Sequence, residues 1–289
     1  MATDAEHRIL ERTIDELPVL PTVLTEVIGL DAGRDDTFDR LVALAESDPP
    51  FAARLIHLAN SARYARRGGS VLDVRGATAR LGSRATSELL TSLAVARVFV
   101  PTTPGQRRLW LHAIQVALAA RRIAKELRTD LDLNTLYLGA LLHDLGRFLL
   151  FETSPEELGQ IDEIGYDTPE GLIAAEHAVC GTDHATLGAL AAEAWRLPDW
   201  LTRLIANHHR QLPRVDRDIR EAVRILQLAD YVGTVLCQVE LGEPTADAAQ
   251  QVAADALRHT PTPISELRLA PIVLHVWRES YERVAALGL

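Results

Sequence analysis

The sequence is poor in cysteine and has no long apolar run. Its 289 residues contain two cysteines, Cys180 and Cys237, which stand far apart and form no CxxC pair. This pattern fits the reduced, buried thiols of a cytoplasmic protein and excludes a disulfide-stapled secreted domain. No apolar run approaches the roughly 18–20 residues that span a bilayer, so we expect no membrane association. The charged, helix-like residues 1–17 indicate no secretory signal.

An overall basic excess is also missing. The formal net charge is −10 and the isoelectric point is about 5.5, which argues against general nucleic-acid binding. Residues 60–128 differ, because they carry thirteen basic and three acidic side chains, a net of +10. Arginine suits phosphate and carboxylate recognition, so we predict a surface for an acidic signalling protein or an anionic nucleotide. The alternative is a set of solvated arginines that the acidic remainder of the chain neutralises. The candidate contacts are Arg63, Arg66, Arg67, Arg108 and, beyond this segment, Arg147.

Apolar residues recur at three- and four-residue steps along most of the chain, as in residues 83–99 and 111–127. This period is typical of amphipathic helices, and only the short run at 70–74 alternates like a strand. We therefore predict an all-α fold, a two-lobed multi-helix bundle. The polar stretch 101–106 is the expected seam between the lobes, and a weaker seam lies at 241–245. The predicted parts are an N-terminal lobe at 1–105, a second lobe at 106–240 and a C-terminal extension at 241–289.

Several histidines and aspartates interrupt the apolar helices of the second lobe. Each has apolar residues on both sides, so its side chain is predicted to point inward, where it needs a partner. Neutral imidazoles and carboxylates suit divalent Fe, Mn or Zn, and a bundle can collect such ligands from facing helices. A single inward histidine is more often a hydrogen-bonded core residue, but the whole set favours a metal site. The candidate ligands are His112, His143, Asp144, His184, His208, His209 and Asp230.

The order of these residues resembles the HD superfamily of metal-dependent phosphohydrolases. That resemblance implies four primary metal ligands, namely His112, His143, Asp144 and Asp230. In an active enzyme of this kind Asp144 would be the catalytic candidate. The HD-GYP branch, which hydrolyses cyclic di-GMP, has further ligands that resemble His184 and the pair His208-His209.

The N-terminal lobe resembles the HDOD domain, the HD-related output domain of bacterial signalling proteins. The motifs that carry this resemblance are DPPFAARLIHLANSA at 48–62 and GATARLG at 76–82. The resemblance runs from about residue 14 to about residue 235. It implies an HD-like second lobe and a non-enzymatic output module, of a family often linked to cyclic di-GMP signalling.

The sequence differs from the catalytic HD-GYP enzymes at two positions that hold arginine. Arg108 occupies the place of a Glu that lies one turn before the first His of HD-GYP enzymes, and it would repel a metal. Arg147 replaces a Lys, and the Gly-Tyr-Pro signature after the paired histidines is missing. Three hypotheses follow: a signalling or ligand-binding module with an HD-like pocket, an active phosphohydrolase acting on a nucleotide or cyclic nucleotide, and a ligand-free scaffold for other proteins. The first is preferred.

Overall fold

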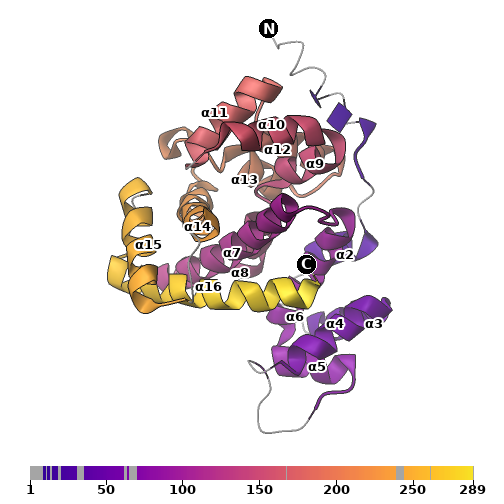
Figure 1. Ribbon diagram of the computed structural model, residues 1–289. Helices are drawn as coiled ribbons and strands as arrows, with labels where there is room; N and C mark the ends of the chain where they lie inside the picture. Colours follow the sequence, from indigo (N-terminus) through magenta and orange to yellow (C-terminus); the bar gives the residue numbers. More distant parts are fainter. Residues whose placement is uncertain are drawn as a thin grey trace. The chain divides into compact units, whose positions relative to one another are not determined.

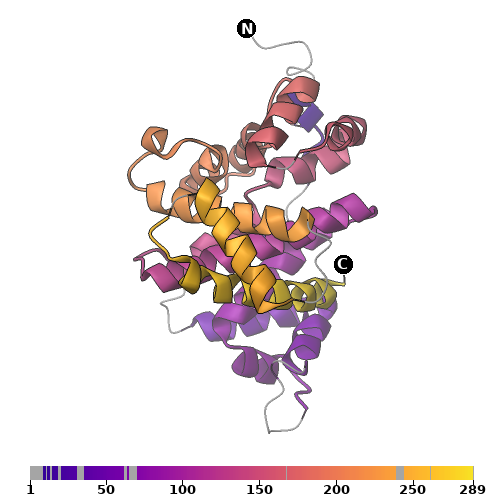
Figure 2. The same cartoon turned by 60° about the vertical axis from the view of Figure 1, so that its left-hand side comes forward.

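The computed structural model describes residues 9–10, 12–13, 15–18, 21–30, 36–61, 64, 70–166, 168–238, 244–260 and 262–288. These residues form helices and short connections, with no β-strand among them, which confirms the all-α prediction (Figures 1 and 2). The strand-like run at 70–74 instead leads into a helix, because the Asp73 carboxylate accepts the backbone N–H of Gly76 and caps a helix that begins at Val74. Within the described ranges, no helix combines the length and hydropathy of a membrane-spanning segment.

The chain divides into two compact units. Unit 1 comprises Met1–Pro18 and Pro101–Tyr281, and unit 2 comprises Val19–Val100 and Glu282–Leu289. The chain therefore passes from unit 2 to unit 1 at the start of the predicted seam, 101–106. The division into 1–105, 106–240 and 241–289 remains a prediction.

Unit 2 is a small helical bundle with a terminal helix segment attached. The buried ion pair between Arg283 and Glu88, 3.1 Å apart, joins the final turns of α16 to α6 within this unit. The helices of this unit are α2 (Thr22–Ile28), α3 (Thr37–Glu46), α4 (Pro49–Ala59), α5 (Val74–Leu81) and α6 (Ser83–Val98).

Unit 1 contains the remaining helices. They are α7 (Pro104–Leu127), α8 (Leu133–Leu141), α9 (Leu145–Thr153), α10 (Pro155–Ile164), α11 (Pro169–Cys180), α12 (His184–Ala194), α13 (Asp199–Asn207), the 3-10 turn η1 (Leu212–Arg214), α14 (Arg220–Gln238), α15 (Ala246–His259) and α16 (Glu266–Leu287), of which the residues up to Tyr281 belong here.

The long helix α7 organises unit 1. Its start is fixed by a capping box in which Thr103 and Gln106 satisfy each other's backbone N–H groups. Most of its residues from Leu109 to Ala124 are buried, and it packs along α8 and α14 (Figure 1). Helices α9 and α12 pack on each other, as do α12 and α13. Most of the polar residues singled out in the sequence lie at the ends of several of these helices: between α8 and α9, at the start of α12 and directly after α13.

Candidate metal centre

The structure brings together all seven residues predicted as metal ligands. They come from five places in unit 1: His112 on α7, His143 and Asp144 in the turn between α8 and α9, His184 at the first position of α12, His208 and His209 directly after α13, and Asp230 on α14. Five of the seven residues therefore lie in or beside a helix end, where the backbone direction changes and a side chain can turn into the centre.

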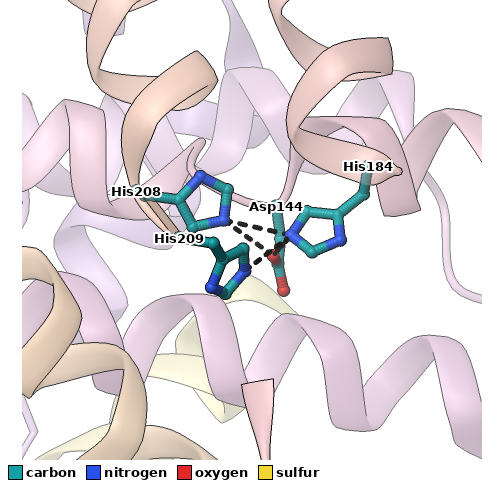
Figure 3. A group of neighbouring side chains, drawn as sticks. All are labelled: Asp144, His184, His208 and His209. Atoms are coloured by element: carbon teal, nitrogen blue, oxygen red, sulfur yellow. Dashed lines mark hydrogen bonds and ion pairs between the residues drawn. The ribbon is translucent and has the colours of Figure 1, made fainter. Parts of the chain in front are cut away.

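Four of these residues form one compact group around His184 (Figure 3). The Nε2 atom of His184 lies 3.0 Å from Nε2 of His208 and 3.0 Å from Nε2 of His209. It also lies 3.1 Å from Oδ1 of Asp144. These four side chains thus offer one ligand atom each to a common point.

Asp144 also belongs to a second group, with His112 and His143. The two imidazoles approach through their Nε2 atoms at 3.3 Å, and Oδ2 of Asp144 lies 3.6 Å from Nε2 of His112. Asp230 adjoins this group, because its Oδ1 lies 3.2 Å from the same nitrogen of His112. The two groups therefore share one carboxylate, and the arrangement offers two neighbouring cation positions.

Three of the imidazoles have their tautomer fixed by a hydrogen bond on the far side of the ring. Nδ1 of His143 donates to the carbonyl of Ala140 at 2.8 Å, and Nδ1 of His208 donates to the carbonyl of Ile205 at 2.6 Å. Nδ1 of His184 donates to the carboxylate of Glu176 at 2.7 Å. Because each ring donates its Nδ1 proton away from the centre, its Nε2 faces the centre and presents a lone pair there whenever the ring is neutral.

Converging lone pairs and carboxylates favour a positive charge between them. Burial opposes ionisation of His184, yet Glu176 and Asp144 raise its pKa to about 10. Burial also opposes ionisation of Asp144, but the neighbouring His143 and His184 hold the pKa of this carboxyl well below its usual range. Burial and the charge on His184 lower the pKa of His209 to about 4. In the protein alone, protons therefore supply positive charge that a metal ion would otherwise supply.

Glycines allow the helices to approach closely enough to assemble this centre. A β-carbon at Gly146, on α9, would overlap the backbone carbonyl of His184. A β-carbon at Gly188, on α12, would lie 2.9 Å from Ile205. One at Gly233, on α14, would lie 2.7 Å from Val116 and 3.1 Å from Nδ1 of His112. A larger residue at any of these positions would separate helices that carry ligands.

A cavity of about 360 Å³ opens onto the centre. Asp144 and Asp230 line it together with His112 and His209, whose side chains are 12% and 17% exposed. The remaining wall is largely apolar, with Phe151, Leu158 and Leu172 among its residues. A volume of this order accommodates a small molecule the size of a nucleotide.

Two of the predicted anion-binding arginines line this cavity. Arg147 lies over the ring of Tyr166 at 5.3 Å and donates to Asp162 at 3.3 Å. Arg108 is exposed, lies on α7 one turn before His112 and is among the residues that line the cavity. Arg63, Arg66 and Arg67 fall outside the described residues, and the surface predicted around them stays a prediction.

Elsewhere in residues 60–128, several arginines pair with acidic residues, so part of the basic excess is neutralised internally. The pairs are Arg75 with Asp39, Arg97 with Asp48 and Arg122 with Glu279.

Sequence reasoning missed Glu176, Asp162 and Tyr166. Glu176 is 1% exposed, and a carboxylate inside the otherwise apolar run GLIAAEHAVC was the signal that could have identified it. Asp162 and Tyr166 carry no such signal, because partly exposed polar residues near a helix end are common.

Comparison with known proteins identifies the family. The model of the HDOD domain matches residues 17–211 of this chain. The chain belongs to the HDOD family. This confirms the resemblance drawn from the motifs in α4 and α5.

An uncharacterized protein of Treponema pallidum (strain Nichols) is 28% identical over 217 residues, which are 75% of this chain and 42% of that relative. The HDOD chain thus spans less than half of the length of that protein.

Solved structures share the HDOD fold. An HDOD domain protein from Geobacter sulfurreducens superposes with a TM-score of 0.72 at 24% identity, over 98% of both chains. A candidate phosphohydrolase from Shewanella amazonensis superposes with a TM-score of 0.73 at 23% identity, over 96% of this chain and 98% of its own. At these identities the similarity establishes the fold.

Proposed function

We propose that this HDOD protein is a signalling output module that holds a divalent metal ion and binds a phosphate-bearing small molecule beside it. The observation that carries the proposal is the convergence of inward-facing imidazole nitrogens and the Asp144 carboxylate at the end of a cavity that Arg108 and Arg147 also line. The metal and the arginines would together recognise an anion that neither could hold as tightly alone.

The donor set fits a divalent transition metal. Imidazole nitrogens combined with carboxylate oxygens suit Fe, Mn or Zn. Fixed Nδ1 hydrogen bonds at His143, His184 and His208 hold the rings in the ligating orientation before any ion arrives. Such preorganisation is typical of metal ligands, whereas core histidines require only that their polar atoms be satisfied.

The cavity wall fits a phosphate group with an apolar or aromatic attachment. Burial opposes the charge on Arg147, but Tyr166 and Asp144 raise the pKa of this guanidinium, so it remains a permanent cation. Its planar fork can bind two phosphate oxygens at once. Phe151 and the leucines nearby offer apolar surface for the rest of the ligand, as a nucleoside would require.

A second candidate function is hydrolysis of a phosphate ester in the same cavity. It is favoured by the direct opening of the cavity onto Asp144 and Asp230, because an ester held by the arginines could reach them. A bound metal would supply Lewis-acid catalysis there. Of the possible substrates, we expect cyclic di-GMP not to be hydrolysed, because Arg108 takes the place of an acidic ligand and the Gly-Tyr-Pro signature is missing.

The test begins with protein that has been purified without chelator and then offered iron, manganese or zinc. Bound metal should be found by elemental analysis, and calorimetry should then detect binding of inorganic phosphate or of members of a nucleotide panel. Arg147→Gln should weaken anion binding about tenfold while the metal is kept, because one charge-assisted contact is lost. The exposed Arg217 offers a matched control, and Arg217→Gln should leave anion binding unchanged.

Each negative result points to a different alternative. No bound metal under any of these conditions would make the centre vestigial. Bound metal without any anion binding would favour the scaffold hypothesis. Metal-dependent turnover of a nucleotide that disappears in a His143→Ala variant would establish the enzyme.

A further inference from the structure

Glu176 is a buried carboxylate that stands behind the metal centre and outside the set of ligands. Its Oε2 atom accepts two hydrogen bonds from the same residue, one from the backbone N–H of His184 at 3.0 Å and one from Nδ1 of its ring at 2.7 Å. His184 is thereby held at both its backbone and its side chain. The side chains of Glu176 and His184 are 1% and 0% exposed, so solvent does not compete for either bond.

His184 differs from the other fixed histidines in the acceptor behind it. His143 and His208 each donate Nδ1–H to the neutral carbonyl of a residue three positions earlier on the preceding helix. His184 donates to a carboxylate from another helix, α11. A carboxylate behind an imidazole orients the ring and makes the opposite nitrogen a stronger electron donor.

His184 also has the central place in its group. Its Nε2 lies within 3.1 Å of atoms on Asp144, His208 and His209, so a small rotation of this one ring changes three distances in the group at once. The second oxygen of Glu176 faces Arg147, with 3.9 Å between Oε1 and Nε. The positive guanidinium on that side balances the carboxylate charge without replacing either bond to His184.

We infer that Glu176 is the positioning residue of this centre: it fixes the tautomer and orientation of His184 and thereby sets the affinity of the Asp144, His184, His208 and His209 group for a divalent metal. This inference rests on the proposed metal site and adds a residue to it. The competing explanation is structural, since Glu176 also satisfies a backbone N–H at the start of α12. That role would affect folding but would not change the properties of a bound metal.

The test compares Glu176→Gln with wild type by titration of cobalt(II) into the full chain. The glutamine keeps the size and one acceptor oxygen but removes the charge. We expect the dissociation constant for cobalt to rise about tenfold or more, and the visible d–d absorption of the bound ion to change. Glu163→Gln, which removes an exposed carboxylate on α10, should leave both unchanged. Thermal unfolding with chelator present shows whether each variant folds.

A folded Glu176→Gln protein with the wild-type affinity and spectrum would overturn the inference. If that variant does not fold, ¹⁵N NMR of the His184 ring in zinc-loaded wild-type protein decides instead. We expect Nδ1 to carry the proton and Nε2 to be the metallated nitrogen, and the reverse assignment would overturn the role of Glu176. Wild-type protein that binds no cobalt or zinc would refute the metal centre itself, which is a separate and recognisable outcome.

Discussion

Gly146 and His184 lie in backbone contact, with no room for a side chain between α9 and the start of α12. A β-carbon built on Gly146 would stand 2.7 Å from the Cα atom of His184 and closer still to its carbonyl oxygen. This contact brings Asp144, two residues earlier, and His184 to the 3.1 Å separation found in the centre. Gly146 is thus a steric requirement of the candidate metal centre.

Gly146→Ala should consequently destabilise the protein by about 3 kcal/mol or more, because rigid backbone has to move. It should also weaken metal binding, since the displaced segment carries His184. Gly159→Ala is a matched control on α10, where a β-carbon would meet nothing within 4 Å. That substitution should be neutral or stabilising by up to about 1 kcal/mol through helix propensity. Denaturant unfolding of the two variants measures the contrast, and equal stabilities would contradict the steric argument.

Asp144 should be more important for metal content than any single histidine. It is shared by both groups of ligands, whereas His143 and His208 each belong to one. Asp144→Asn keeps the shape but removes the charge, and we expect it to abolish metal binding at both positions. His208→Ala should lower metal content while leaving some behind. Elemental analysis after equilibration with excess metal gives the stoichiometries, and a larger loss in His208→Ala than in Asp144→Asn would contradict a shared carboxylate.

Metal affinity should rise with pH across the neutral range. The pKa of His184 is raised to about 10, so at pH 7 this ring carries a proton that the metal must displace. The pKa of His209 is lowered to about 4, so this imidazole is neutral at pH 7 and releases no proton when it binds a metal. Displacement of one proton predicts about a tenfold gain in affinity per pH unit between pH 6 and pH 9. Calorimetry in buffers of different ionisation enthalpy counts the released protons, and a pH-independent affinity with no release would contradict this assignment.

The sequence predicted the helices and the grouping of the candidate ligands better than it predicted the surroundings of the centre. The three- to four-residue period of α6, α7 and α12 is a local property, and the inward direction of His112 follows from the apolar residues beside it. The contacts of Glu176 with His184 and of Arg147 with Tyr166 join segments that meet only in the folded chain, so no local sequence pattern predicts them. Arg108 shows the same limit. Its position one turn before His112 predicts repulsion of a metal, which stays a prediction, and only the folded chain adds that this residue lines the cavity beside the centre.

The two cysteines should differ in reactivity and can report on the cavity. Cys180 is 1% exposed, and burial together with the charge of Glu176 raises the pKa of its thiol to about 11. At pH 8 it is therefore protonated and shielded, and alkylation should be very slow. Cys237 is half-buried, donates to Oε1 of Gln115 at 3.1 Å and lines the cavity. We expect iodoacetamide to label Cys237 first in the native protein and both residues in denaturant.

A ligand in the cavity should then protect Cys237 from labelling. Cys237, Arg108 and Arg147 line the same cavity, so a phosphate-bearing molecule held there by the arginines would hinder the approach of the reagent. Labelling rates measured by mass spectrometry, with and without zinc and a bound nucleotide, give the protection factor. Protection should be lost in Arg147→Gln and kept in Arg217→Gln. If a nucleotide that binds by calorimetry leaves the rate of Cys237 labelling unchanged, the ligand occupies another site and the assignment of this cavity is wrong.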